Sequence, residues 1–83
     1  MATMTKGQAL YLAACRAIGL DPAAHGSQTR LLECCDDIAN QGQISKWKHG
    51  KMNPSDKVVR QMEERFKFRL EHLGWIAVHE GEA

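Results

Sequence analysis

The sequence predicts an all-α fold: a compact four-helix domain over residues 1–83, ending in a short strand or an extended tail. Three observations support this prediction. A chain of 83 residues has room for one small core. Apolar residues recur at spacings of three and four in four segments, which places them on one face of a helix. Capping residues or a glycine bound each of these segments.

The first helix is expected from Lys6 to Ile18. Thr5 can cap it, Gln8 completes a capping box, and Gly19 ends it. Its buried stripe combines small and aliphatic residues: Leu10, Ala13, Ala14, Ala17 and Ile18.

The second helix is expected to follow a connection over residues 20–26. We expect Ser27 to cap it, and the helix to run from Gln28 to between Cys35 and Asp37. Its buried side would consist of Leu31, Leu32 and Cys35.

The third helix, residues 40–49, is short and has two different edges. Asn40 and Gln43 form a capping-box pair, and Gly50 is a natural stop. Ile44 and Trp47 are three residues apart and predict a buried edge. The other side chains are amides, a hydroxyl and ammonium groups: Gln41, Gln43, Ser45, Lys46 and Lys48.

The fourth helix carries the most regular apolar stripe of the chain. We expect Asn53 as its cap, Pro54 as its first residue and Gly74 as its stop, so that it extends to about Leu73. The stripe consists of Val59, Met62, Phe66, Leu70 and Leu73.

Apolar residues outside that stripe point to a second subunit. A domain of this size would not cover all of them, so we predict a dimerisation segment over about residues 66–80. The tail would form a strand that pairs across a homodimer, although packing of Trp75 over its own core fits the sequence equally well. The predicted interface residues are Phe68, Trp75, Ile76 and Val78.

Charge is segregated along the chain, although the net charge is only +1. Residues 41–60 carry five cationic side chains and one carboxylate, while the segments on either side are each net negative. This pattern favours a polyanionic partner at the third helix. A solvated, lysine-rich surface is the alternative.

The stretch from Ile44 to Lys51, followed by Asn53-Pro54-Ser55, resembles the recognition helix and following loop of the lambda-type repressor and Cro helix-turn-helix family. Gly26-Ser27-Gln28-Thr29 is similar to the start of the first motif helix in short Cro-like phage proteins. The resemblance covers about residues 26–66 and places the motif at about 27–50. The connection before Asn40 lacks the glycine that is usual in the family.

The resemblance implies a sequence-specific DNA-binding transcriptional regulator, by default a repressor in a phage, prophage or toxin-antitoxin context. It would bind a double-stranded operator as a homodimer. The residues expected to contact bases are Gln41, Gln43, Ser45 and Lys46. Those expected to contact phosphates are Gln28, Thr29, Lys48, Lys51 and Asn53.

Other classes of function have less support. A small module that binds or inhibits another protein on the same scaffold is the main alternative, because the net charge is modest. The three cysteines and four histidines form no Cys-x-x-Cys or His-x-x-x-His pair, so we predict no metal, no cofactor and no enzyme activity. No apolar run nears the roughly 20 residues of a membrane span, and we expect a cytoplasmic protein.

Overall fold

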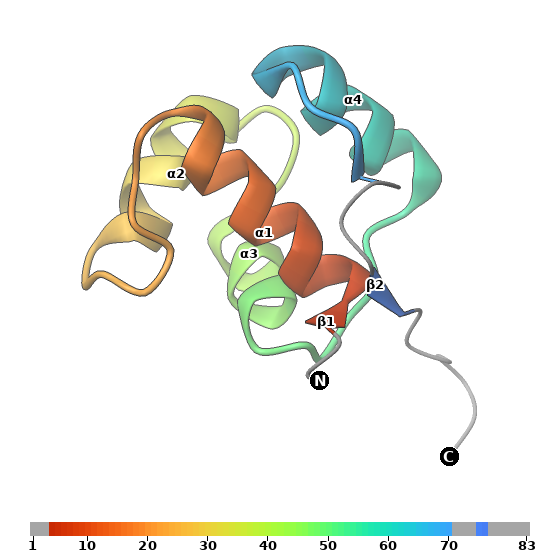
Figure 1. Ribbon diagram of the computed structural model, residues 1–83, viewed down its shortest axis with the longest axis horizontal. Coiled ribbons are helices and arrows are strands. Elements are labelled where there is room, and N and C mark those ends of the chain that lie inside the picture. Colours follow the sequence, from red (N-terminus) through yellow and green to blue (C-terminus); the bar gives the residue numbers. More distant parts are fainter. Residues whose placement is uncertain (1–3, 71–74, 77–83) are drawn as a thin grey trace.

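The computed structural model describes residues 4–70 and 75–76, and within them it confirms the predicted all-α architecture of four helices (Figure 1). The helices are α1 (Lys6–Ala17), α2 (Ser27–Cys35), α3 (Gln41–Lys48) and α4 (Asp56–Phe66). Two short strands, β1 (Met4–Thr5) and β2 (Trp75–Ile76), complete the described elements.

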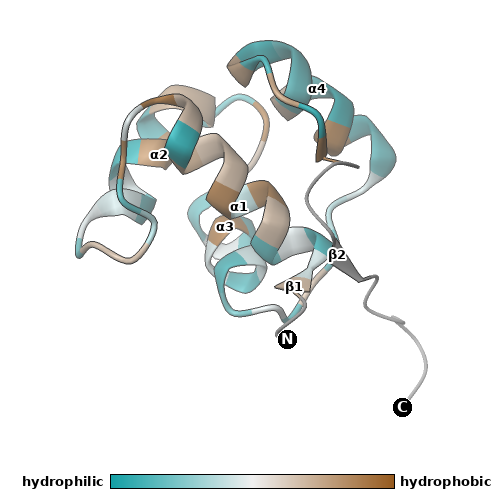
Figure 2. Ribbon diagram, viewed as in Figure 1, coloured by the Kyte–Doolittle hydropathy of each residue, from teal (hydrophilic) through white to brown (hydrophobic). Residues whose placement is uncertain are grey.

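Helix α1 lies at the centre and packs against α2, α3 and α4 (Figure 1). Ala9 and Ala14 are 0% exposed. The predicted burial of Ala17 and Ile18 is wrong, because both lie at the end of α1, where they are exposed. The core around it combines side chains from every helix: Leu10, Cys15, Leu31, Cys35, Ile44, Trp47, Met62 and Leu70. The hydrophobic residues of α1 accordingly lie along the middle of the molecule (Figure 2).

The first turn of α1 contacts other backbone segments at Gly7 without space for a side chain. A Cβ atom at this position would lie 2.5 Å from the carbonyl oxygen of Met52 and 2.9 Å from the Cα of Trp47. Both are backbone atoms, which cannot swing aside as a flexible side chain can. The packing of α3 against α1 therefore requires a glycine at position 7.

The start of α1 is as predicted, but the start of α2 is not. Thr5 and Gln8 form a reciprocal capping box, with N–H to oxygen distances of 3.2 and 3.0 Å. At α2 the N-cap is Gly26, so the prediction that Ser27 caps this helix is wrong. Ser27 is instead the first helical residue, buried, with its hydroxyl donating to the backbone oxygen of Asp21.

Helix α4 starts later and ends earlier than predicted. Its cap is Ser55, not Asn53, because Pro54 is buried and the chain stays extended through Ser55. The Ser55 hydroxyl accepts a hydrogen bond from the N–H of Val58 at 3.3 Å. The predicted continuation to Leu73 with a stop at Gly74 is wrong, since α4 ends at Phe66.

The end of α4 is fixed by a left-handed residue and a side-chain cap. Lys67 has φ 61°, and its N–H donates to the carbonyl of Glu63 at 2.8 Å. The Glu63 carboxylate accepts a hydrogen bond from the N–H of Leu70, also at 2.8 Å. This turn brings Leu70 into the core and packs Phe68 against it.

The predicted carboxyl-terminal strand is present, but its partner lies in the same chain. Strand β2 pairs in parallel with β1, with Met4 opposite Trp75 and Thr5 opposite Ile76. Of the predicted interface residues, Phe68 is half-buried against its own core, and Val78 lies outside the described residues. Pairing of this strand across a homodimer stays a prediction, since a single chain does not test it.

Gly7→Ala should destabilise the protein, whereas Gly42→Ala should not. Both glycines are the second residue of a helix that begins with a capping box. A Cβ at Gly42 would meet only the Asn40 side chain, at 3.4 Å. We expect Gly7→Ala to lower the free energy of unfolding by about 1–3 kcal/mol or more, and Gly42→Ala to raise it by up to about 1 kcal/mol. Denaturant unfolding followed by circular dichroism measures both, and equal stabilities would contradict the proposed contact.

Candidate nucleic-acid interface

Helix α3 is fixed at both ends by the interactions that the sequence predicted. The Asn40 side chain accepts the N–H of Gln43 at 2.8 Å, and the Gln43 side chain accepts the N–H of Asn40 at 3.0 Å. At the other end Gly50 has φ 70°, a conformation that favours glycine. The N–H of Lys51 donates to the carbonyl of Lys46 at 2.8 Å, and that of Gly50 to Trp47 at 3.0 Å. These two bonds form a Schellman motif.

The two edges of α3 separate as expected. Ile44 and Trp47 are both 0% exposed and face the core, where α3 packs mainly on α1. The opposite side, which we call the α3 outer face, consists of Gln41, Gly42, Ser45, Lys46 and His49. All of these are exposed except Ser45, which is half-buried. The outer face thus presents an amide, a hydroxyl, an ammonium group and an imidazole.

Gln43 differs from the other residues predicted to contact bases. It is half-buried, and its side-chain oxygen is engaged in the cap at Asn40. A substitution at Gln43 would therefore weaken the helix start as well as remove an amide. Gln41, Ser45 and Lys46 carry no such structural role among the interactions described.

The residues predicted to contact phosphates lie in the first turn of α2, at the end of α3 and in the segment after α3. Gln28, half-buried, and Thr29, exposed, are in the first turn of α2. Lys51 is exposed and Asn53 half-buried in the segment after α3. In Figure 1 the start of α2 and the whole of α3 lie below α4. The first turn of α2 has the N–H groups and dipole end that favour an anion.

Lys48 is held against α1. Its Nζ lies 5.9 Å from the centre of the Tyr11 ring, at the limit of a cation–π contact. No local pattern in the sequence predicts this contact, because Tyr11 and Lys48 belong to different helices. Tyr11 is only 3% exposed, and burial together with the nearby Cys15 thiol raises its pKa to about 12.

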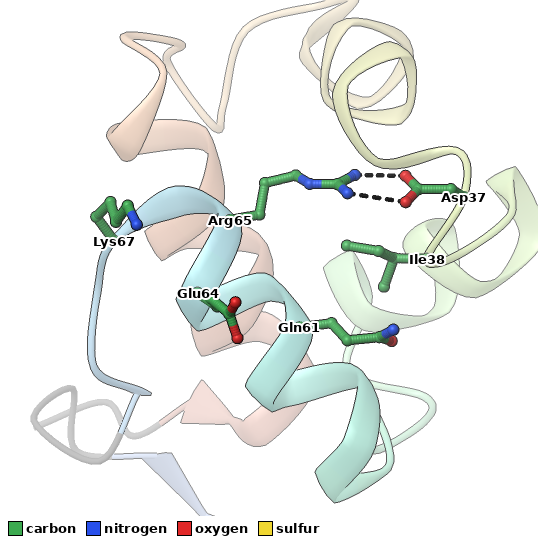
Figure 3. Close-up of a pocket in the computed structure, with 6 residues that line it drawn as sticks. All are labelled: Asp37, Ile38, Gln61, Glu64, Arg65 and Lys67. Carbon is green, nitrogen blue, oxygen red and sulfur yellow. Dashed lines mark hydrogen bonds and ion pairs between the residues drawn. The ribbon is translucent and has the colours of Figure 1, made fainter.

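Two of the carboxylates that flank α3 in the sequence have cationic partners. Asp37 receives two hydrogen bonds from the Arg65 guanidinium, of which Nη2 to Oδ2 is 2.8 Å (Figure 3). Asp56, at the start of α4, pairs with Lys6 at 3.1 Å. Residues 41–55 contain three lysines and no carboxylate. The α3 outer face and the loop after it are therefore cationic.

Arg65 also braces the connection between α2 and α3. Its Nη1 donates to the backbone oxygen of Cys34 at 3.2 Å, next to the bond with Asp37. The hydrogen bond from Arg65 lowers the pKa of Asp37 below its ordinary value. The sequence did not predict this link, which joins residues 28 positions apart.

Neither a cluster of metal-ligating side chains nor a membrane-spanning helix is found in the described part of the chain. No three metal-ligating side chains come together there. The cysteines are free, with Cys15 and Cys35 buried and Cys34 exposed. Among the same residues, no helix is long and apolar enough to cross a membrane.

Comparison with known proteins adds no assignment. Protein-family models, curated proteins and solved structures were searched, and none matched this chain.

The buried phenol of Tyr11 should make the protein less stable at alkaline pH. The folded state favours the neutral phenol, so the pKa of Tyr11 is raised from its ordinary value of 10.0 to about 12. The contribution of this preference to the free energy of unfolding is complete below pH 10 and is lost as the pH rises toward about 12. A shift of this size corresponds to roughly 2–3 kcal/mol. Tyr11 is the single tyrosine, so tyrosinate absorbance reports it alone. A midpoint near 10 would contradict its burial, and Tyr11→Phe should remove this part of the alkaline destabilisation.

Removing Arg65 should return the pKa of Asp37 toward its ordinary value of 3.8. The bridge stabilises the fold above that value, and the effect is lost as the pH falls through the lowered pKa. Carboxyl chemical shifts measured by NMR during an acid titration of Arg65→Gln would test this. Arg60→Gln removes an exposed cation from the same helix and should leave Asp37 unchanged. An equal change in both variants would rule out the specific bridge.

Proposed function

We propose that this protein is a sequence-specific DNA-binding regulator that inserts the α3 outer face into the major groove. The observation that carries the proposal is the presentation of α3. Ile44 and Trp47 pack one side of α3 into the core, and both ends of the helix are capped. Its exposed side consists of hydrogen-bonding and cationic groups. A major groove about 12 Å wide accepts one α-helix.

Three residues of the outer face have chemistry suited to base edges. The Gln41 amide can donate to and accept from adenine, and the Lys46 ammonium group can donate to the O6 and N7 of guanine. The Ser45 hydroxyl can serve several bases. These three are the proposed reading residues, while Gln43 contributes chiefly by starting the helix.

Phosphate contacts would orient α3 in the groove. Lys51 follows the helix directly, and Lys48 is held at its end by Tyr11. Gln28 and Thr29 would contact the DNA phosphate backbone on one side of the groove, together with the N–H groups at the start of α2. Such contacts supply affinity without reading sequence.

A dimer is part of the proposal. Helix α3 has only eight residues and spans about 12 Å, so one copy would read few base pairs. Two copies on a two-fold symmetric site would provide useful specificity. Repression by occupying a promoter is the default mode of regulation, as the family resemblance implies.

Lys46→Ala and Gln41→Ala should weaken specific DNA binding without unfolding the protein. Operator sequences would first be selected from random DNA with the wild-type protein. Each variant should then lose about 1–3 kcal/mol of affinity for the selected sequence, as measured by fluorescence anisotropy. Lys67→Ala and Gln61→Ala are the matched controls, because they remove the same groups from exposed positions at or near α4.

Two results would contradict the proposal. One is the failure of selection to enrich any sequence. The other is unchanged affinity in both outer-face variants when circular dichroism shows that they are folded. A salt titration separates DNA binding from the protein-binding alternative, because binding through several lysines must weaken steeply as the salt concentration rises.

A further inference from the structure

A second feature lies at the opposite end of the molecule from α3. A shallow hollow of about 410 Å³ is formed between the second half of α1 and the turn that ends α4. Its apolar lining comes from Ala13 and Ala17 of α1 and from Phe66 and Phe68. Ala17 is exposed and Phe68 half-buried, so this apolar surface is open to a partner.

Every charged residue that lines this hollow is a cation. These are Arg16 on α1, and Lys67 and Arg69 on the turn. All three are exposed. The hollow therefore combines an apolar floor with a positive rim.

From this combination we infer that the hollow binds an acidic peptide segment of another protein, with apolar side chains on the floor and carboxylates at the rim. Arg16 and Lys67 would pair with those carboxylates, while Phe68 would gain apolar contact. A second copy of the chain is the poorer occupant. A two-fold contact centred here would bring Arg16 and Lys67 of both copies together, and like charges repel.

Nucleic acid is also a poorer occupant than an acidic peptide. An apolar floor would gain little against a phosphate backbone, whose affinity comes from charge. In Figure 1 the end of α4 is at the top of the molecule and α3 is near the bottom. Binding of a peptide at the hollow is thus compatible with DNA at α3 and does not depend on it.

A random-peptide display library is the probe. The full-length protein would be used for selection, and binding of the enriched peptides would then be measured by fluorescence anisotropy. We expect enrichment of peptides that combine Asp or Glu with large apolar residues. Arg16→Gln/Lys67→Gln should weaken their binding by about two- to thirtyfold, as loss of two exposed ionic contacts implies. The control, Arg30→Gln/Lys57→Gln, removes the same charge from other exposed positions and should bind normally.

The possible outcomes decide the inference. Loss of peptide binding in the first double variant alone supports it, as would NMR shifts of Ala17 and Phe68 on adding the peptide. No enrichment, enrichment without acidic residues, or equal binding by both double variants would overturn it. Weakened DNA binding by Arg16→Gln/Lys67→Gln would also overturn it and would assign the hollow to nucleic acid. A failure of the DNA-binding proposal would be detected separately, as unchanged DNA affinity of Lys46→Ala and Gln41→Ala.

Discussion

The contact between α1 and α3 at Gly7 is the constraint on which the rest of the structure depends. Here two backbones meet with no space for a Cβ atom. Because α3 can come this close, Trp47 reaches full burial beneath it. That burial in turn fixes which side of α3 remains outside. A larger residue at Gly7 would push α3 away and misalign the outer face with whatever it binds.

The arrangement of α3 also reduces the entropic cost of binding. The cap at Asn40 and the Schellman motif at Gly50 satisfy backbone groups at both ends, so this short helix is already formed in the free protein. A preformed element has less conformational entropy to lose on contact with a ligand. The proposed functions use separate surfaces, since the outer face is polar and the hollow beside Phe68 has an apolar floor.

The sequence predicted what local chemistry controls. The cap at Asn40 and the burial of Trp47 follow from spacing along one helix, and the structure agrees. The cap assigned to Ser27 failed because burial turned its hydroxyl toward a distant carbonyl. Nothing near Lys67 indicates a left-handed residue, because its conformation depends on the turn that returns Leu70 to the core. The outer face was found because helix periodicity defines it, whereas the hollow needs two segments brought together by folding.

The pairing of β1 with β2 has a kinetic consequence. It joins Thr5 to Ile76, so nearly the whole described chain must be ordered before these residues can meet. Contacts between such remote positions form late, because closing a long loop costs entropy that only a folded core can offset. Two paired residues are too few to persist alone. The β1–β2 pair should therefore be the last part of the described structure to form and the first whose amide hydrogens exchange with solvent.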